Sequence, residues 1–360
     1  MRLGKPYLHD LGLSRRAVLG AAAALTAATL AACSSPAATP ASTPGNSPAA
    51  GGGSITVYNA QHESLTKEWI DGFTQETGIT VTYRQGSDTE MANQLLAEGA
   101  NSPADVFLTE NSPAMTLVEN AGLFAPIDAA TVAQVPAEYR PTTNAWTGIA
   151  ARATVFVYNT DKLKEADLPA SLMDLAKPEW KGRWAASPSG ADFQAIVSAV
   201  LQLKGETETL AWLKAMKENA TAIKGNSAVM KAVNAGEFDG GVIYHYYYFG
   251  DQAKGAQNSA KIGSHYFGHQ DPGAFVSVSG GGVLKSSKNA EAAQKFVAYI
   301  TSRAGQEVLR DGTSFEYPVA SGVQANPKLK PLAEMDAPTI DPASLNSPQV
   351  VELMQQAGLL

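Results

Sequence analysis

The segment GGVIYHYYYFG, residues 240–250, concentrates side chains that could bind a metal ion. Four of the five residues from Tyr244 to Tyr248 are tyrosines, and the fifth is His245. A neutral phenol is a poor ligand because its pKa is about 10. A trivalent cation changes this balance, since a hard, highly charged ion favours oxygen anions and drives the phenol to deprotonate. Tyrosines at a strand end more commonly pack in a hydrophobic core than bind a metal ion. The residues elsewhere in the chain are therefore needed to distinguish core packing from metal binding.

The spacing of the tyrosines restricts how two of them could share one ion. Adjacent side chains on a regular strand point to opposite faces, so two consecutive strand residues cannot both bind the same ion. At a turn from strand to helix they can splay to the same side, and the positive end of the helix would stabilise their phenolate forms. Residues 240–244 are predicted to form a strand, which puts the next tyrosines at such a turn.

The rest of the chain alternates between predicted strands and helices. The clearest helix follows the first strand, with Leu65, Trp69 and Phe73 on one face and Gly78 as its stop. The predicted strands are residues 54–60, 79–84, 104–109, 154–159, 183–187 and 240–244. The predicted helices are residues 63–78, 89–99, 112–122, 192–205, 228–237 and, as one long helix, 290–309.

Strands that alternate with helices imply βαβ units on mostly parallel sheets, an α/β fold. Ligands of such sheets bind beyond the carboxyl ends of the strands. Polar side chains occur at this class of position after several of the predicted strands, and this convergence predicts a binding site. The polar residues concerned are His62, Glu63, Glu110, Ser189, Asn226, His245, Tyr246, Tyr247 and Tyr248, and the small residues Gly190 and Ala191 follow Ser189.

The N-terminal region has the features of an export signal. Arg15 and Arg16 precede an apolar run over residues 17–32, which is too short to span a bilayer. The arginine pair suggests the twin-arginine pathway. The sequence LAAC, residues 30–33, resembles the lipobox of bacterial lipoproteins, in which Cys33 would be acylated. We therefore expect a signal peptide over residues 1–32 and a lipid-anchored, disordered tether rich in Ser, Pro, Ala and Gly over residues 33–53.

Charge and motif content argue against other classes of function. The chain has a net charge of −7 and its first 32 residues carry +3, which leaves −7 − 3 = −10 for the remainder. An acidic surface argues against nucleic acid as a partner. The sequence contains no Gly-x-Ser-x-Gly elbow, no His-Glu-x-x-His motif and no Gly-rich phosphate loop, so we do not expect an enzyme. Cys33 is the single cysteine, so no disulfide can form within the chain.

Six motifs resemble, in the same order, those of bacterial ferric-ion-binding proteins. They are ITVYNAQHE, PADVFLTEN, ARATVFVYNTDKL, PSGADF, GNSAVMKAVNAGE and YHYYYFG, and the resemblance extends over the chain after the tether. Members of this family are extracytoplasmic binding components of ABC iron importers with a transferrin-like, two-lobed fold of the type II periplasmic-binding-protein class. The resemblance implies an N-lobe of residues 54–151 and about 275–325, and a C-lobe of residues 152–274 and about 326–360, with the ligand between them.

The resemblance also implies a ligand set. His62 and Glu110 would bind Fe³⁺ from one lobe, and Tyr246 and Tyr247 from the other. A synergistic anion such as carbonate or phosphate would rest on a helix N-terminus, with Arg152 adding positive charge. The anion-binding residues would be Ser189, Gly190, Ala191, Asn226 and Arg152.

The chain departs from the family pattern around the tyrosines. Tyr244 and His245 replace an asparagine pair, and Tyr248 replaces a tryptophan. The register of the ligand pair is therefore open between Tyr246 with Tyr247 and Tyr247 with Tyr248. Without the contacts of these asparagines, the site could bind a different anion from that of other family members, or no anion.

The function that the resemblance implies is capture of Fe³⁺ between two lobes and delivery to the permease and ATPase of an ABC importer. The protein would be a monomer, lipid-anchored through Cys33 to the outer face of the cell membrane, or periplasmic. An alternative is the same fold with an organic solute, such as thiamine, a polyamine, a phosphonate or a sugar-phosphate. An extracytoplasmic hydrolase built on His62 and Glu110 is a third interpretation.

Overall fold

The computed structural model describes residues 53–360. The expected signal peptide, Cys33 and all of the expected tether except its last residue lie outside the described residues. Within residues 53–360 no helix is both long enough and apolar enough to cross a membrane.

The elements follow the predicted alternation, with additions late in the chain. The strands are β1 Ser54–Asn59, β2 Thr80–Gln85, β3 Val106–Leu108, β4 Thr147–Asn159, β5 Trp184–Ala186, β6 Ala220–Ala222, β7 Gly240–Tyr244, β8 Ile262–His265 and β9 Val276–Val283. The α-helices are α1 Glu63–Thr77, α2 Asp88–Glu98, α3 Ser112–Asn120, α4 Ala129–Val132, α5 Ala191–Asn219, α6 Asn226–Ala235, α7 His245–Ala253, α8 Ala290–Thr301, α9 Arg303–Asp311 and α10 Ser347–Gln356. Short 3₁₀ turns connect several of them.

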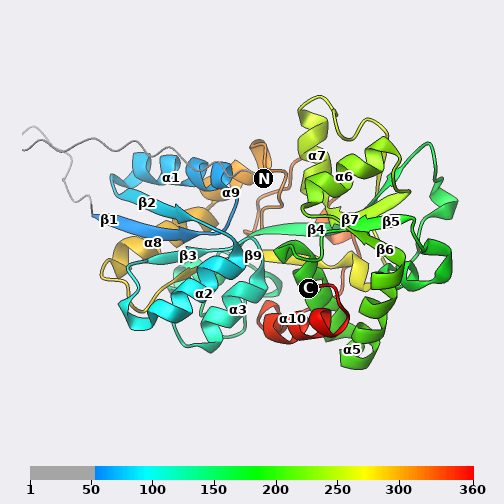
Figure 1. Cartoon of the computed structure of the whole chain (residues 1–360). Helices are drawn as coiled ribbons and strands as arrows, with labels where there is room; N and C mark the ends of the chain where they lie inside the picture. Colours follow the sequence, from blue (N-terminus) through cyan, green and yellow to red (C-terminus); the bar gives the residue numbers. More distant parts are fainter. Residues whose placement is uncertain (1–52) are drawn as a thin grey trace, which may run out of the picture. The chain divides into compact units, whose positions relative to one another are not determined.

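All of these strands belong to one sheet, in the order β2-β1-β3-β9-β4-β7-β5-β6, with β8 paired to β4. At one end β1 pairs in parallel with β2 and β3, and at the other β5 pairs in parallel with β6 and β7. The central strands β4 and β9 are antiparallel to their neighbours. Each end has its own helices, with α1, α2, α3 and α8 around β1–β3 and α5, α6 and α7 around β5–β7 (Figure 1). The fold is therefore an α/β fold in two halves, of the class expected from the sequence.

Three segments connect the two halves. In β4, residues 147–153 pair with β9, and residues 154–159 pair with β7 and β8. β9 passes between β3 and β4, so it also contacts strands of both halves. A third connection follows α9, where Tyr317 forms an isolated antiparallel bridge with Ala151 of β4.

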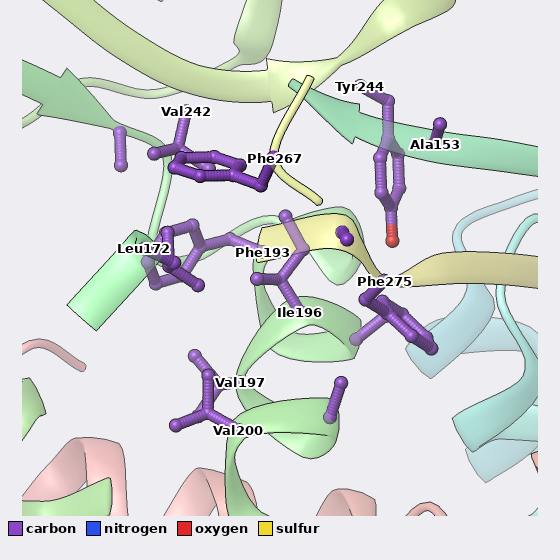
Figure 2. Close-up of a cluster of buried hydrophobic side chains, with 14 of the residues drawn as sticks. Ala153, Leu172, Phe193, Ile196, Val197, Val200, Val242, Tyr244, Phe267 and Phe275 are labelled. Carbon is purple, nitrogen blue, oxygen red and sulfur yellow. The ribbon is translucent and has the colours of Figure 1, made fainter. Parts of the chain in front are cut away.

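Helices cover both faces of each half. In the first half, Leu65, Trp69 and Phe73 of α1 are buried against β1 and α8, as their spacing predicts. In the second half, α5 packs its apolar face, which includes Phe193 and Ile196, toward Val242 of β7 (Figure 2). Helix α6 covers the opposite face of the second half, where it packs against β4 and β7. These cores fix the strand ends from which the candidate site residues project.

The predicted single helix over residues 290–309 is wrong, because the chain forms two helices there. Helix α8 ends at Thr301 and α9 begins at Arg303, with Ser302 in an extended conformation between them. The Ser302 hydroxyl accepts a hydrogen bond from the backbone N–H of Gly305, which caps α9. Trp69 also donates its indole N–H to the Gly305 carbonyl at 2.8 Å. A break of one residue leaves the spacing of the apolar residues almost unchanged. The helical pattern in the sequence therefore continues from α8 into α9 and does not reveal the break.

Candidate metal centre

The tyrosine segment lies at the predicted turn from strand to helix. Tyr244 is the last residue of β7, and Tyr246 and Tyr247 belong to the first turn of α7. Their ring centroids are 4.3 Å apart and the ring planes differ by 31°. Both hydroxyls donate to the same atom, Oδ2 of Asp192, at 3.2 and 3.3 Å. The two phenols therefore converge on one point, at the positive end of α7.

Asp192 is a site residue that the sequence analysis did not select. It occupies the second position of α5, immediately after the predicted anion-binding residue Ala191. Its carboxylate also accepts hydrogen bonds from the side-chain amides of Asn226 at 2.8 Å and Asn111 at 2.9 Å. Burial raises the pKa of Asp192, and the nearby charge of Glu110 raises it further. A signal was present in the sequence, since PSGADF puts an acidic residue at this helix start, but such a residue also favours a helix N-terminus without any ligand.

His62 and Glu110 face the tyrosine pair from the other half of the sheet. Nε2 of His62 lies 3.1 Å from Oε1 of Glu110. The imidazole packs edge-on against the Tyr246 ring, with the two ring centroids 4.9 Å apart. Glu110 is positioned by Asp88, whose carboxylate accepts hydrogen bonds from the backbone N–H groups of Glu110 and Asn111 at 2.9 and 3.0 Å. The structure therefore brings together the four residues predicted as metal ligands.

The imidazole of His62 lies between two carboxylates. Its Nδ1 is 2.8 Å from Oε1 of Glu316, and its Nε2 faces Glu110. Burial lowers the pKa of His62, but the hydrogen bonds and charges of Glu110 and Glu316 outweigh it and raise the pKa to about 10. Without metal, both ring nitrogens therefore carry protons at neutral pH. A metal ion at this site would replace the proton on Nε2.

Arg152, predicted as an added positive charge, is fully buried beside the site. It donates through Nη2 to Glu316 and to Ser279, while Nη1 lies 3.6 Å from Oε2 of Glu110. Its guanidinium carbon is 5.4 Å from the centroid of the Tyr246 ring. Arg152 therefore offsets part of the negative charge that Glu110, Glu316 and two phenolates would bring into one buried region.

The phenols of the metal-free protein are neutral. Burial raises the pKa of Tyr246 well above its usual range, and the charges of Asp192 and Glu110 raise it further. The same causes raise the pKa of Tyr247. Only a strongly charged cation between these oxygens could favour the phenolate forms. In residues 53–360, no group of three or more His, Cys, Asp and Glu side chains is arranged to hold a metal ion.

Three of the predicted anion-binding residues lie at two helix N-termini beside Asp192. Gly190 precedes α5, Ala191 is its first residue, and Asn226 is the first residue of α6. These three line a cavity of about 240 Å³ together with Glu110 and Asp192.

Ser189 differs from the other predicted anion-binding residues. Its side chain is exposed, and it is absent from the lining of this cavity. Ser187 lines the cavity instead, and its hydroxyl accepts a hydrogen bond from the backbone N–H of Gly225 at 2.9 Å.

A second cavity lies on the other side of the tyrosine pair. It has a volume of about 280 Å³, and His62, Tyr246 and Tyr247 line it together with polar residues such as Lys254 and Asn258. Tyr247 lines both cavities. A metal ion held by the tyrosine pair could therefore be reached from either cavity.

Tyr248, the alternative ligand, lies elsewhere. It packs with the apolar cluster around Val229 and Ile243, and its ring lies 5.2 Å from that of Phe249. Tyr248 is absent from the linings of both cavities. The geometry therefore favours the register of Tyr246 with Tyr247.

His245 has a structural role at the same turn. Its Nδ1 accepts a hydrogen bond from the backbone N–H of Ala153 at 3.2 Å, and its Nε2 lies 2.7 Å from the carbonyl oxygen of Phe315. Burial lowers the pKa of His245 to about 4, so the ring is neutral and Nε2 is the donor. These bonds attach the start of α7 to β4 and to the third connection between the halves.

Known iron-binding proteins are similar to this chain in sequence and in structure. A family model described as bacterial extracellular solute-binding protein matches residues 101–343. The Fe(3+)-binding periplasmic protein of Serratia marcescens is 68% identical over 306 residues, which cover 85% of this chain and 90% of that protein. The major ferric iron-binding protein of Neisseria meningitidis serogroup B is 37% identical over 309 residues, covering 85% and 93%. Among solved structures, iron-bound HitA from Pseudomonas aeruginosa matches with a TM-score of 0.81 at 42% identity, covering 85% of this chain and 100% of that chain.

Proposed function

Because the chain belongs to the bacterial ferric-ion-binding family of extracellular solute-binding proteins, we propose that it captures Fe³⁺ between the two halves of its fold for delivery to an ABC importer. The observation that carries this proposal is the convergence of Tyr246 and Tyr247 on a single carboxylate oxygen, opposite His62 and Glu110. Two adjacent phenolates, an imidazole and a carboxylate form a hard, anionic donor set of the kind a trivalent ion prefers.

The geometry supports a fifth ligand from the chain itself. Oδ2 of Asp192 lies 3.2 and 3.3 Å from the hydroxyls of Tyr246 and Tyr247. Oxygens at neighbouring positions around a six-coordinate ion are roughly 3 Å apart when the bonds are about 2.0–2.1 Å. Asp192 could therefore occupy the position expected for a synergistic anion, while Gly190, Ala191 and Asn226 leave room beside it for carbonate, phosphate or water.

The proposal also includes export of the protein, its lipid anchor, its two lobes and its transporter partners. Residues 1–32 would act as the export signal, and Cys33 would carry the lipid that holds the protein at the outer face of the membrane. The halves would act as lobes with the boundaries expected from the sequence, and the protein would work as a monomer with a permease and an ATPase. We propose no catalytic role, since the relatives that match are binding proteins.

A visible absorption spectrum of the Fe³⁺-loaded protein tests the proposal. Phenolate-to-iron charge transfer should give a visible band and a red colour, and the double substitution Tyr246→Phe with Tyr247→Phe should abolish both. Tyr248→Phe is the matched control and should leave the band unchanged. A band that survives in the double variant would exclude these two tyrosines as ligands.

Titration calorimetry separates iron from an organic cargo in the same fold. Fe³⁺ supplied as its citrate complex should bind, whereas thiamine, spermidine, a phosphonate and a sugar-phosphate should give no heat of binding. Tight binding of one of these solutes, with no iron-dependent band, would favour the alternative function instead.

A further inference from the structure

Glu316 lies on the third connection between the halves and contacts a predicted metal ligand directly. It is fully buried, and its Oε1 lies 2.8 Å from Nδ1 of His62. Its other oxygen, Oε2, accepts hydrogen bonds from Nη2 of Arg152 and from Nε2 of Gln61. A carboxylate in this position has no direct access to the Nε2 side of the ring, where Glu110 lies.

We propose that Glu316 is a positioning residue of the iron site, which holds the imidazole of His62 in the one orientation and tautomer that directs Nε2 to the metal. This inference rests on the proposed function, because it concerns how one ligand of the proposed Fe³⁺ site is held.

The proposal follows from the chemistry of the imidazole ring. A metal-binding histidine has one nitrogen for the metal and one that is free to donate a hydrogen bond. A carboxylate that accepts this hydrogen bond fixes the ring orientation and the tautomer, and makes the ligating nitrogen more basic. Oε1 of Glu316 is in the position to accept from Nδ1, which leaves Nε2 for the ion between Glu110 and the tyrosines.

Glu316 is held directly by Arg152 of β4 and by Gln61, and both of these residues also contact Ser279 of β9. Arg152 of β4 donates to Glu316 and, through the same nitrogen, to the hydroxyl of Ser279 in β9. Gln61 donates to both Ser279 and Glu316, at 3.0 and 3.3 Å, and its side-chain oxygen accepts from the backbone N–H of His62 at 2.7 Å. The carboxylate that orients His62 is therefore fixed by the segments about which the two halves would move.

A double-mutant cycle between Glu316 and His62 tests whether Glu316 acts through the imidazole. Glu316→Gln should weaken Fe³⁺ binding about 10- to 100-fold in the wild-type background, the usual effect of removing an outer-shell partner of a metal ligand. In a His62→Ala background the same substitution should change the affinity by less than about twofold, because there is no ring left to orient. Affinity is measured by competition with citrate, using the charge-transfer band.

Ser279→Ala is the matched control for this cycle. It removes a different partner of Arg152 from the same buried network but does not touch the His62 ring. Its effect on affinity should be similar in both backgrounds. If Glu316→Gln instead causes equal losses with and without His62, Glu316 acts through the connection between the halves, and the proposal is overturned.

A measurement on the unsubstituted protein covers the case in which Glu316→Gln fails to fold. In protein labelled with ¹⁵N-histidine and loaded with diamagnetic Ga³⁺, NMR should show Nδ1 of His62 protonated and hydrogen-bonded, with Nε2 bound to the metal. Coordination through Nδ1 would overturn the proposal. If the wild-type protein shows no tyrosine-dependent iron band at all, the proposed function fails, which is a different result from an iron site that is indifferent to Glu316.

Discussion

The hydroxyl of Tyr246 lies 3.2 Å from Oδ2 of Asp192, so a residue at the start of α7 and a residue at the start of α5 meet at one point. Both helices direct their positive ends toward this point, where negative charge would collect on iron binding. Because the carboxylate belongs to the chain, part of the anionic charge that completes the proposed iron site is supplied without a second ligand.

Substitution of Asp192 should make iron binding depend on an added anion. Wild-type protein should bind Fe³⁺ with nearly the same affinity with and without phosphate or carbonate. Asp192→Ala should lose at least about 10- to 100-fold in anion-free buffer, the range usual for loss of an outer-shell partner, and recover part of the loss when phosphate is added. The measurement is competition with nitrilotriacetate at several phosphate concentrations.

Ser189→Ala provides the control for that experiment, because the exposed Ser189 side chain is not among the cavity-lining residues. It should change neither the affinity nor its response to phosphate. Equal phosphate dependence in wild-type protein and in Asp192→Ala would show that Asp192 does not occupy the anion position.

Iron binding should release protons and should tighten as the pH rises. Burial and nearby carboxylates raise the pKa values of Tyr246 and Tyr247, and two carboxylates raise the pKa of His62 to about 10 despite its burial. These three groups are protonated in the metal-free protein at neutral pH and must each lose a proton to bind the ion. About three protons should therefore leave per iron bound, measured in weakly buffered solution against a chelator blank.

Tyr247→Phe should reduce that release by about one proton, whereas Tyr248→Phe should leave it unchanged. The sign of the pH dependence follows directly, since protons compete with the ion and affinity falls as the pH is lowered. An affinity that is constant between pH 6 and 8, measured on the same protein, would contradict the proposed ligand set.

The parts of the site that the sequence predicts are those with local signals. Helix α1 carries its apolar face at regular spacing, and the strand before the tyrosines ends where its apolar run ends, so the turn that bears Tyr246 and Tyr247 could be located. The assignment of His62, Glu110 and the tyrosine pair came from the resemblance to a family. The structure brings these residues together, and their role as ligands remains a prediction.

The parts that the sequence does not predict depend on distant contacts. Glu316 lies in an irregular segment, 254 positions from His62, and no periodic pattern marks it. Strand β9 contains three consecutive glycines, which ordinarily disfavour a strand. Tight packing explains these glycines, because a Cβ on Gly280 would lie 2.3 Å from Cγ of Met115. The need for glycine in β9, like the position of Glu316, depends on residues that are distant in the sequence, so it can be recognised only in the folded structure.

Loss of the cap between α8 and α9 should destabilise the protein by about 1 kcal/mol, the usual cost of removing an N-cap side chain. Ser302→Ala removes the hydroxyl that accepts from Gly305, whereas Ser302→Thr keeps a hydroxyl in place. Urea unfolding of the metal-free protein measures both. The threonine variant should stay close to wild type, and equal losses in the two variants would indicate a steric effect at this position instead.

The buried His245 should make the protein less stable in mild acid. Burial lowers the pKa of His245 to about 4, below its ordinary value of 6.5, so the folded state keeps the ring neutral while the unfolded state takes up a proton. The contribution of a group with a lowered pKa is present above pH 6.5 and is lost as the pH falls toward about 4.

The measurement is the free energy of unfolding of wild-type protein relative to His245→Phe, which cannot titrate at this position. The wild-type advantage should shrink by up to about 3 kcal/mol between pH 6.5 and 4, since each pKa unit corresponds to about 1.4 kcal/mol. His269→Gln, at a fully exposed position, is the control for replacing a histidine that is not buried. A constant difference across this range would mean that His245 is protonated in the folded protein.

Asn111 joins the two halves of the fold next to the proposed iron site. Its side-chain amide donates to Asp88 of the first half at 3.2 Å and to Asp192 of the second at 2.9 Å. Its side-chain oxygen accepts from the hydroxyls of Tyr244 at 3.2 Å and Ser277 at 2.8 Å. Asn111→Ala would leave several buried polar groups without a partner, and each such group costs about 1–3 kcal/mol.

The loss of these bridges should favour separation of the halves as well as unfolding. Small-angle X-ray scattering of metal-free Asn111→Ala should give a larger radius of gyration than wild type, and Fe³⁺ should dissociate faster from the loaded variant. Tyr244→Phe removes one of the four hydrogen bonds and should show a smaller change in the same direction. An unchanged radius together with an unchanged dissociation rate would mean that Asn111 stabilises the fold without holding its halves together.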